Sequence, residues 1–144
     1  MLYLIKDATD QFFKFLNDDP VRPNIPVEDR LGNNKGIFVL PDEQKIQAIT
    51  CVSFQDNIPK TENELFTNQS TPIVAIYYTI WSYKPGAGRQ LILDSVNYIK
   101  KQNSNIKRFV TLSPKTEMAR KFHLRNGAIV LNENTDTINY EYIF

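Results

Sequence analysis

The apolar positions of the chain follow two different periods, which predicts a mixture of strands and helices. Seven short apolar runs have the length and composition of strands, at residues 2–5, 36–40, 45–54, 72–81, 106–112, 128–131 and 138–143. The run 72–81 is apolar on both faces, which is typical of a strand in the middle of a covered sheet. The runs 36–40 and 45–54 are separated by a short polar turn, which favours an antiparallel hairpin.

Two segments show the helical period instead. Residues 8–16 contain large apolar side chains at helical spacing, at Phe12, Phe13, Phe15 and Leu16. Residues 89–102 place their apolar side chains on one face, at Leu91, Ile92, Val96 and Ile99. The order of strands and helices therefore predicts a mixed α/β layout, with antiparallel strands early and a βαβα unit late.

A third helix is predicted to begin at Ser113 and Pro114, because serine is a good N-cap and proline is favoured at the first helical position. We expect this helix to extend to residue 126, with Gly127 as its natural C-terminal cap. The polar segments 18–34 and 55–71 lack any period and predict long connections, the first with one helical turn at most.

Length and charge narrow the possible functions. A chain of 144 residues predicts one domain, covering residues 1–144. Its 17 basic and 16 acidic residues are nearly balanced, which argues against a nucleic-acid partner. No apolar run is long enough to cross a membrane, and charges at Lys6 and Asp7 come too early for a secretory signal. We therefore expect a cytoplasmic protein.

Cysteine content excludes two further classes. Cys51 is the only cysteine, so neither an internal disulfide nor a cysteine-rich zinc site is possible. We expect no bound metal. Cys51 falls within a predicted strand, where burial is its most ordinary role.

Gly86 and Gly88 lie between the strand at 72–81 and the helix at 89–102. The first N–H groups of such a helix face the loop and favour an anion there, and glycines let the backbone approach phosphate oxygens. The loop lacks the Gly-Lys-Ser/Thr of a Walker motif, and Leu91 replaces the third glycine of a Rossmann motif. The pattern predicts a phosphate-binding turn of another type.

The sequence around these glycines, Tyr83-Lys-Pro-Gly-Ala-Gly-Arg-Gln-Leu-Ile92, resembles the coenzyme A pyrophosphate motif of the GNAT acyltransferase family. Tyr83 departs from the Arg or Gln that usually begins that motif. A second segment, Ala119-Arg-Lys-Phe-His-Leu-Arg-Asn-Gly-Ala128, is similar to the family's Ala-x-x-Phe-Tyr-x-x-x-Gly-Phe. The resemblance implies a mostly antiparallel central sheet of six to seven strands, flanked by helices, with splayed fourth and fifth strands.

The same resemblance implies a cosubstrate, coenzyme A or acetyl-CoA, held without a metal. Its pantetheine arm would lie in the gap beside the strand at 72–81, and its phosphates would lie at the glycine loop. The residues implied for binding are Tyr78, Thr79, Ile80, Lys84, Gly86, Ala87, Gly88, Arg89 and Gln90.

His123 occupies the position where many of these acyltransferases have a tyrosine that protonates the departing thiolate. Three segments, 75–80, 111–114 and 122–128, also resemble the matching parts of the malonyl-CoA decarboxylase family. That family uses a serine and a histidine, which would here be Ser113 and His123, and Thr111 is a second candidate on the same strand face. Histidine can exchange a proton near neutral pH, so either chemistry is possible.

Three functions remain open at this point. The first is direct transfer of an acyl group, acetyl in the simplest case, from coenzyme A to an unidentified amine on a small molecule or protein. It needs a base, for which the loops offer Glu28, Asp29, Asp56, Glu62 and Glu64. The second is decarboxylation of a malonyl-type thioester by Ser113 and His123. The third is acyl-CoA binding without catalysis. We rank transfer first because it is the commonest activity on this fold. The protein is expected to be a monomer or a homodimer.

Overall fold

Eight strands form one mixed sheet in the computed structural model, which describes residues 1–144. The strands lie in the order β1-β2-β3-β4-β5-β8, with both β6 and β7 on β8. Their bounds are β1 (Tyr3–Ile5), β2 (Lys35–Asp42), β3 (Lys45–Gln55), β4 (Val74–Ser82), β5 (Arg108–Thr111), β6 (Ser113–Pro114), β7 (Ile129–Glu133) and β8 (Thr137–Tyr142). Every pair is antiparallel except β4 and β5, which confirms the predicted sheet type.

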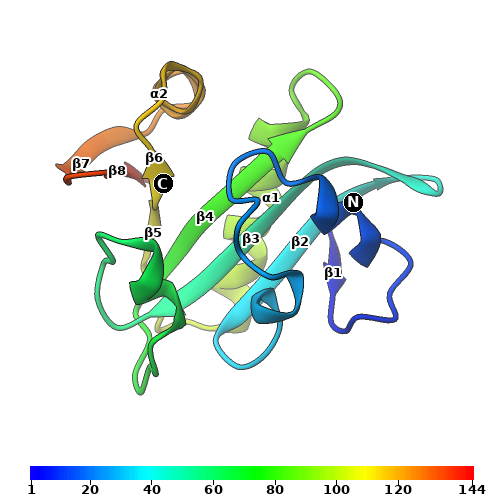
Figure 1. The fold of residues 1–144 in the computed structure, drawn as a ribbon, viewed down its shortest axis with the longest axis horizontal. Helices are drawn as coiled ribbons and strands as arrows, with labels where there is room; N and C mark the ends of the chain where they lie inside the picture. The colour runs from blue at the N-terminus through cyan, green and yellow to red at the C-terminus, as the bar shows by residue number, and fades with distance from the viewer.

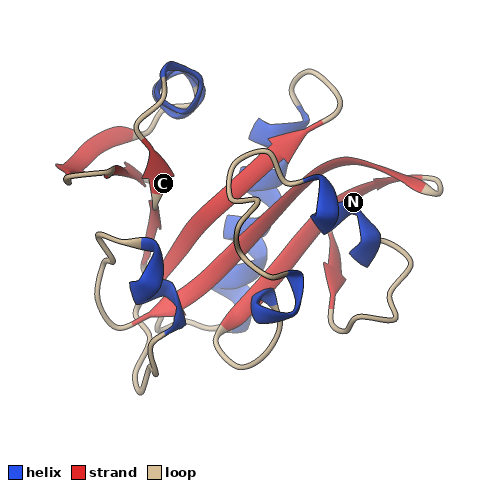
Figure 2. Cartoon of the chain, in the orientation of Figure 1, coloured by secondary structure: helices blue, strands red, loops and turns tan.

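Figure 1 shows the sheet between two layers, with α1 (Ala87–Gln102) behind it and the N-terminal segment in front. A second helix, α2 (Glu117–Arg125), lies apart from α1 at the end of the sheet where β6, β7 and β8 meet. Three short 3-10 helices complete the chain: η1 (Phe13–Asp18), η2 (Val27–Arg30) and η3 (Glu62–Phe66). All three lie in long connections, as Figure 2 shows.

The helix predicted at residues 8–16 is wrong, since only the 3-10 turns of η1 form there. The carboxylate of Asp7 accepts from the backbone N–H of Thr9 (2.9 Å), and that of Asp10 accepts from the N–H of Phe12 (2.9 Å). Such local side-chain bonds compete with the helical ladder for backbone donors. The predicted burial is nevertheless present at Phe12, which is 2% exposed.

The helix start predicted at Ser113 and Pro114 is also wrong. These two residues form β6, which pairs with β8 through Ser113–Ile138 and Pro114–Thr137. The N-cap is instead Thr116, whose hydroxyl accepts from the backbone N–H of Ala119 (3.2 Å). Pro114 has no N–H to donate to a neighbouring strand, and at the edge of a sheet this lack costs little stability. The predicted helix end is confirmed, because Gly127 follows α2 with φ +97°.

Strand β4 contributes to both hydrophobic clusters of the core, as its unbroken apolar run predicted. Ala75 and Tyr77 belong to the cluster of 17 buried residues beneath α1. Val74, Ile76 and Tyr78 belong to the cluster of 15 beneath the N-terminal segment. β4 is therefore covered on both faces and fixed in the middle of the sheet.

Strands β4 and β5 pair over only part of β4. Their register runs from Val74–Arg108 to Tyr77–Thr111, and the last bond between them joins the Leu112 N–H to the Tyr77 carbonyl (3.0 Å). On the other side of β4, the pairing with β3 shifts by one residue at Tyr78, which marks a β-bulge. Beyond this point the segment that follows β5 turns away from β4, and its residues in β6 pair with β8. Figure 1 shows the divergence. We call the point after Tyr77 and Thr111 the fork.

Candidate functional site

A cavity of about 740 Å³ opens beyond the fork, between the unpaired half of β4 and the segment that leads into α2. Residues 77–83 form one wall. The opposite wall includes Ser113, Pro114, Phe122 and His123. We call this cavity the slot. The splayed strands predicted from the sequence therefore leave a real opening, with β4 backbone along its length.

Four of the residues implied for cofactor binding line the slot: Tyr78, Thr79, Ile80 and Gly88. Gly88 lies at its far end, at the start of α1. Gly86 is the N-cap of α1 with φ +81°, a left-handed conformation that favours glycine. The first-turn N–H groups of Gly88 and Arg89 do not bond to the loop that precedes them. Free N–H groups at a helix start suit an anion.

The remaining residues of the predicted phosphate loop do not line the slot. Lys84 forms an ion pair with Asp42 (3.0 Å), and Arg89 donates to the carbonyl of Asn126 (3.4 Å). Gln90 donates to Asp94 (2.8 Å), while Ala87 is buried at the first position of α1. The backbone and not these side chains therefore supplies the donors at this end.

Gly88 has a second role, in packing. A Cβ on Gly88 would lie 2.9 Å from two atoms of the Phe122 ring. Phe122 belongs to α2 and lines the slot as well. The absence of a side chain at Gly88 thus allows α2 to approach the start of α1, which brings both sequence motifs to one cavity.

His123 lies in the slot wall and is 4% exposed. Its ring stacks on Tyr140 (centroids 5.1 Å apart) and meets the edge of Phe122 (5.1 Å). Burial lowers the pKa of the imidazole from its usual 6.5 to about 4, because no carboxylate offsets the lost hydration. His123 is therefore neutral at physiological pH, held in one orientation by aromatic contacts.

One hydrogen bond joins this neutral ring to Tyr142 and bears on its tautomer. Nδ1 of His123 lies 2.7 Å from the hydroxyl of Tyr142, which makes no other hydrogen bond. Burial raises the pKa of Tyr142, so the hydroxyl keeps its proton and can donate it to Nδ1. A neutral imidazole has one N–H, which then lies on Nε2. Nε2–H has no acceptor within the protein, so it remains available to a ligand.

Ser113 lines the slot, whereas Thr111 lies behind it. The Ser113 hydroxyl donates to the Thr111 hydroxyl oxygen (2.8 Å), which also accepts from the backbone N–H of Tyr140 (3.0 Å). No hydrogen bond joins Ser113 and His123. The structure thus brings the two predicted catalytic residues to one cavity without a direct bond between them, and gives Thr111 a supporting place.

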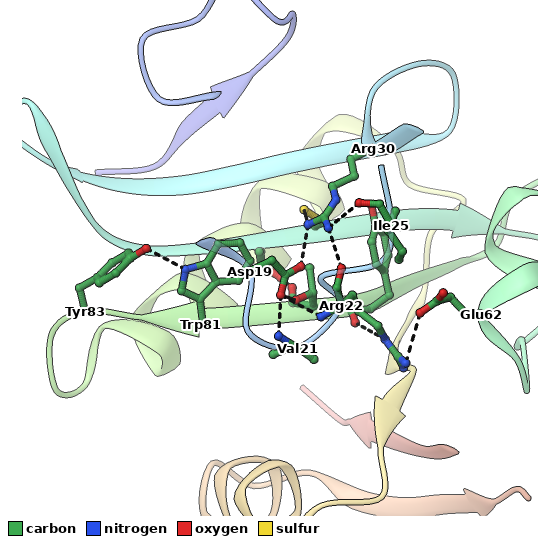
Figure 3. A network of polar contacts seen from close by, with 12 residues as sticks. Asp19, Val21, Arg22, Ile25, Arg30, Glu62, Trp81 and Tyr83 are labelled. Atoms are coloured by element: carbon green, nitrogen blue, oxygen red, sulfur yellow. Dashed lines mark hydrogen bonds and ion pairs between the residues drawn. The ribbon is translucent and has the colours of Figure 1, made fainter. Parts of the chain in front are cut away.

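A polar network lies behind the slot and is bonded to its β4 wall, as Figure 3 shows. Asp19 and Arg30 form a buried ion pair (2.6 Å), and each side chain is 1% exposed. Asp19 also accepts from the Thr79 hydroxyl (2.9 Å) on β4. Arg22 donates to two backbone carbonyls beside the fork, those of Tyr78 (3.3 Å) and Leu112 (2.8 Å). The irregular segment 18–34 is thereby attached to the strands that form the slot.

Several site residues were not identified from the sequence. Asp18 is the one carboxylate that lines the slot, and it accepts from the hydroxyl of Tyr83 (3.3 Å). None of the five acidic residues proposed as bases lines it. Arg22 and Tyr142 were missed as well, because only tertiary contacts connect them to the slot. The run of polar and proline residues around Asp18 predicted a loop, with nothing in it to indicate a site.

No group of three or more His, Cys, Asp or Glu side chains could hold a metal ion. Neither α1 nor α2 has the length and hydropathy that a membrane-spanning helix needs. Cys51 is buried, and burial raises the pKa of its thiol to about 12. The site therefore consists of a neutral imidazole, hydroxyl groups, one carboxylate and backbone donors.

Comparison with known proteins places this geometry in a known fold. No family model and no curated protein matches the sequence. Among solved structures, malonyl-CoA decarboxylase from Cupriavidus metallidurans superimposes with a TM-score of 0.78 at 14% identity, over 99% of this chain and 60% of that one. The Agrobacterium vitis decarboxylase has a TM-score of 0.71 at 20% identity, over 88% and 36%. The chain therefore spans 60% and 36% of the length of these two decarboxylases.

Acetyltransferase structures are similar as well. The GNAT domain of PAT from S. lividans superimposes with a TM-score of 0.66 at 10% identity, over 98% of this chain and 88% of that one. At these identities the likeness establishes the fold alone. The chain has the GNAT fold, with structural neighbours among both N-acetyltransferases and malonyl-CoA decarboxylases.

Proposed function

We propose that this protein binds an acyl thioester of coenzyme A in the slot and decarboxylates a malonyl-type acyl group. The observation that supports this reaction is the state of His123. His123 is buried in the slot wall, its Nδ1 is bonded to the Tyr142 hydroxyl, and its Nε2 has no partner in the protein. With Tyr142 as the donor, the neutral ring carries its proton on Nε2. A neutral donor of this kind stabilises a developing enolate oxygen and does not act as a base near pH 7.

Coenzyme A fits the slot by its chemistry. The free N–H groups at the start of α1 suit the pyrophosphate, and the pantetheine amides would bond to the unpaired backbone of β4. The Thermoplasma acidophilum N-acetyltransferase, solved in complex with coenzyme A, shares this fold with a TM-score of 0.56 at 12% identity over 77% of this chain. With the phosphates at Gly88, the thioester would lie toward the fork, near Tyr78 and His123.

The reaction needs no base. The bond between the carboxylate and the α-carbon breaks, and carbon dioxide leaves. The electron pair of the broken bond stays on the α-carbon and forms the thioester enolate. His123 Nε2–H donates a hydrogen bond to the enolate oxygen, and solvent supplies the proton that converts the α-carbon to a methyl group. The Ser113 hydroxyl can turn from Thr111 to a carboxylate oxygen and orient it before cleavage.

The experiment is incubation of the purified protein with malonyl-CoA, without any amine, followed by mass spectrometry of the thioester. We expect acetyl-CoA and carbon dioxide. His123→Ala should abolish turnover, whereas His123→Gln keeps an N–H donor and should retain part of it. Turnover that is unchanged in His123→Ala would contradict the proposal. Binding of malonyl-CoA without any turnover would point to the non-catalytic alternative.

Acyl transfer to an amine is the second candidate, and one observation favours it. Asp18 lines the slot and could accept a proton from a bound ammonium group, so that the free amine attacks the thioester carbonyl. In that reaction His123 Nε2–H would donate to the thioester oxygen or to the departing sulfur. The same assay with acetyl-CoA and a panel of small amines and lysine peptides tests it. An acylated amine that disappears in Asp18→Asn would favour transfer over decarboxylation.

A further inference from the structure

The fork leaves two backbone carbonyls without strand partners, and one side chain bonds to both. Beyond the Leu112–Tyr77 bond, the carbonyls of Tyr78 on β4 and Leu112 after β5 face a widening gap. Arg22 Nε donates to the Tyr78 carbonyl (3.3 Å), and Nη2 donates to the Leu112 carbonyl (2.8 Å). The guanidinium thus connects the two strands at the point where their own ladder ends.

Arg22 is itself held from three sides. Its backbone N–H donates to Asp19 (2.9 Å), and its carbonyl accepts from Arg30 Nη2 (2.8 Å). Its Nη1 pairs with Glu62 (3.5 Å) on η3. The Arg22 side chain is 11% exposed, whereas that of Glu62 is 38% exposed. Arg22 is therefore a fixed group, with the buried Asp19–Arg30 pair behind it.

We propose that Arg22 is a positioning residue that sets the separation of β4 and β5 at the closed end of the slot. This inference depends on the proposed function, which places the thioester at that end. A guanidinium suits the role because its planar, rigid set of donors fixes two acceptors at a defined spacing. Without it, both carbonyls lose their partner, and the strands can draw together or admit water.

The test compares Arg22→Met, which removes the donors at similar length, with Arg22→Lys, which keeps a charge and one donor group. Arg108→Met is the matched control, because Arg108 lies on β5 outside the slot and pairs with Glu141. Hydrogen exchange of the amides in 77–82 and 111–114 reports the fork directly. We expect exchange in Arg22→Met to rise there by at least about tenfold, which is the effect of losing one of the two hydrogen bonds, and to be unchanged in Arg108→Met.

Kinetics separate positioning from general stability. Arg22→Met should lower kcat for the thioester about a hundredfold, the usual effect of a misplaced reacting group, while the Kd of free coenzyme A stays within about threefold. Arg22→Lys should recover part of kcat. Unchanged exchange at the fork, or an unchanged kcat in the folded Arg22→Met protein, would overturn the proposal. If Arg22→Met does not fold, exchange at the fork is measured in Arg22→Lys instead. Faster exchange there supports the positioning role of Arg22, and unchanged exchange overturns it.

The outcome for Arg22 is distinguishable from that for the proposed function. A wild-type protein that turns over no thioester contradicts the function. Exchange at the fork and coenzyme A affinity then decide the role of Arg22 without any turnover. In that case, faster amide exchange at the fork of Arg22→Met with unchanged coenzyme A affinity still supports the positioning role of Arg22. Unchanged exchange at the fork excludes that role.

Discussion

The Tyr142 hydroxyl lies 2.7 Å from Nδ1 of His123, and this bond leaves Nε2 as the ring nitrogen without a partner in the protein. Tyr142 is the last residue of β8, whereas His123 lies near the end of α2. The relationship thus spans two elements whose sequences show no sign of a shared role. A hydroxyl that is buried, protonated and without another acceptor leaves the imidazole one tautomer, with its proton on Nε2.

Tyr142→Phe should release that tautomer. Without the hydroxyl, Nδ1 loses its donor, and the ring proton can distribute between the two nitrogens. The ¹⁵N chemical shifts of the imidazole should change from a pure Nε2–H pattern to a mixture. Turnover should fall, by less than the roughly 10²–10⁴-fold that a positioned acid or base contributes, because part of the rings keep the proton on Nε2. An Nε2–H pattern that persists in Tyr142→Phe would show that the aromatic contacts fix the ring unaided.

Stability should fall as the pH decreases from about 6.5 to about 4. The pKa of His123 is lowered to about 4 in the folded protein from 6.5 ordinarily, so in this range the unfolded chain binds a proton that the folded chain does not. The stabilisation is complete above about pH 6.5, and up to about 3 kcal/mol is lost on approaching pH 4.

Urea unfolding at several pH values measures this loss, with His123→Gln as the control because glutamine does not titrate. The difference in unfolding free energy between wild type and His123→Gln should shrink with decreasing pH. A difference that stays constant over that range would mean that His123 keeps an ordinary pKa.

Gly88→Ala should impair coenzyme A binding through Phe122. The new Cβ would lie 2.9 Å from the Phe122 ring, which must move, and the ring lines the slot. Overpacking of this size typically costs about 1–3 kcal/mol. Calorimetry with coenzyme A should show weaker binding in Gly88→Ala and recovery in Gly88→Ala with Phe122→Leu, where the clash is removed. Gly86→Ala is the control for backbone strain, because nothing lies within 4 Å of a Cβ there.

Arg30→Met should be among the most destabilising substitutions in the chain. It leaves the Asp19 carboxylate, 1% exposed, without its ion partner, which typically costs about 3–5 kcal/mol. Arg108→Met removes a pair with Glu141 whose arginine side chain is 45% exposed, and should cost at most about 1 kcal/mol. Unfolding free energies of the two variants provide the comparison. Equal losses would mean that the buried pair contributes no more than a surface pair.

Cys51 should not react with thiol reagents in the folded protein. It is fully buried, and its pKa is raised to about 12, so almost no thiolate forms near neutral pH. Labelling with iodoacetamide should require unfolding and follow the urea transition. Fast labelling of the native protein would show that β3 opens locally.

Local sequence determined the elements and the motif at the glycine loop. The apolar run of β4 predicted a central strand, and Gly86 and Gly88 predicted a turn into a helix, because these signals depend on neighbours in the chain. The resemblance built on the residues around Gly86 and His123 gave the GNAT fold, which the structure confirms. Two predictions were wrong. At residues 8–16, hydrogen bonds to the side chains of Asp7 and Asp10 override the helical propensity, and at Ser113 pairing with β8 does so.

The tertiary structure alone decided which side chains line the slot and which contact its walls from behind. Asp18, Arg22 and Tyr142 come from a loop and an end strand, and the sequence gives no reason to connect them with His123. The divergence of β4 and β5 creates the cavity. It also leaves the carbonyls of Tyr78 and Leu112 to be bonded by Arg22. The sequence left the charge state of His123 undecided as well, because that state depends on tertiary burial. Residue type sets the ordinary pKa of a histidine, but burial among Phe122, Tyr140 and Tyr142 lowers it.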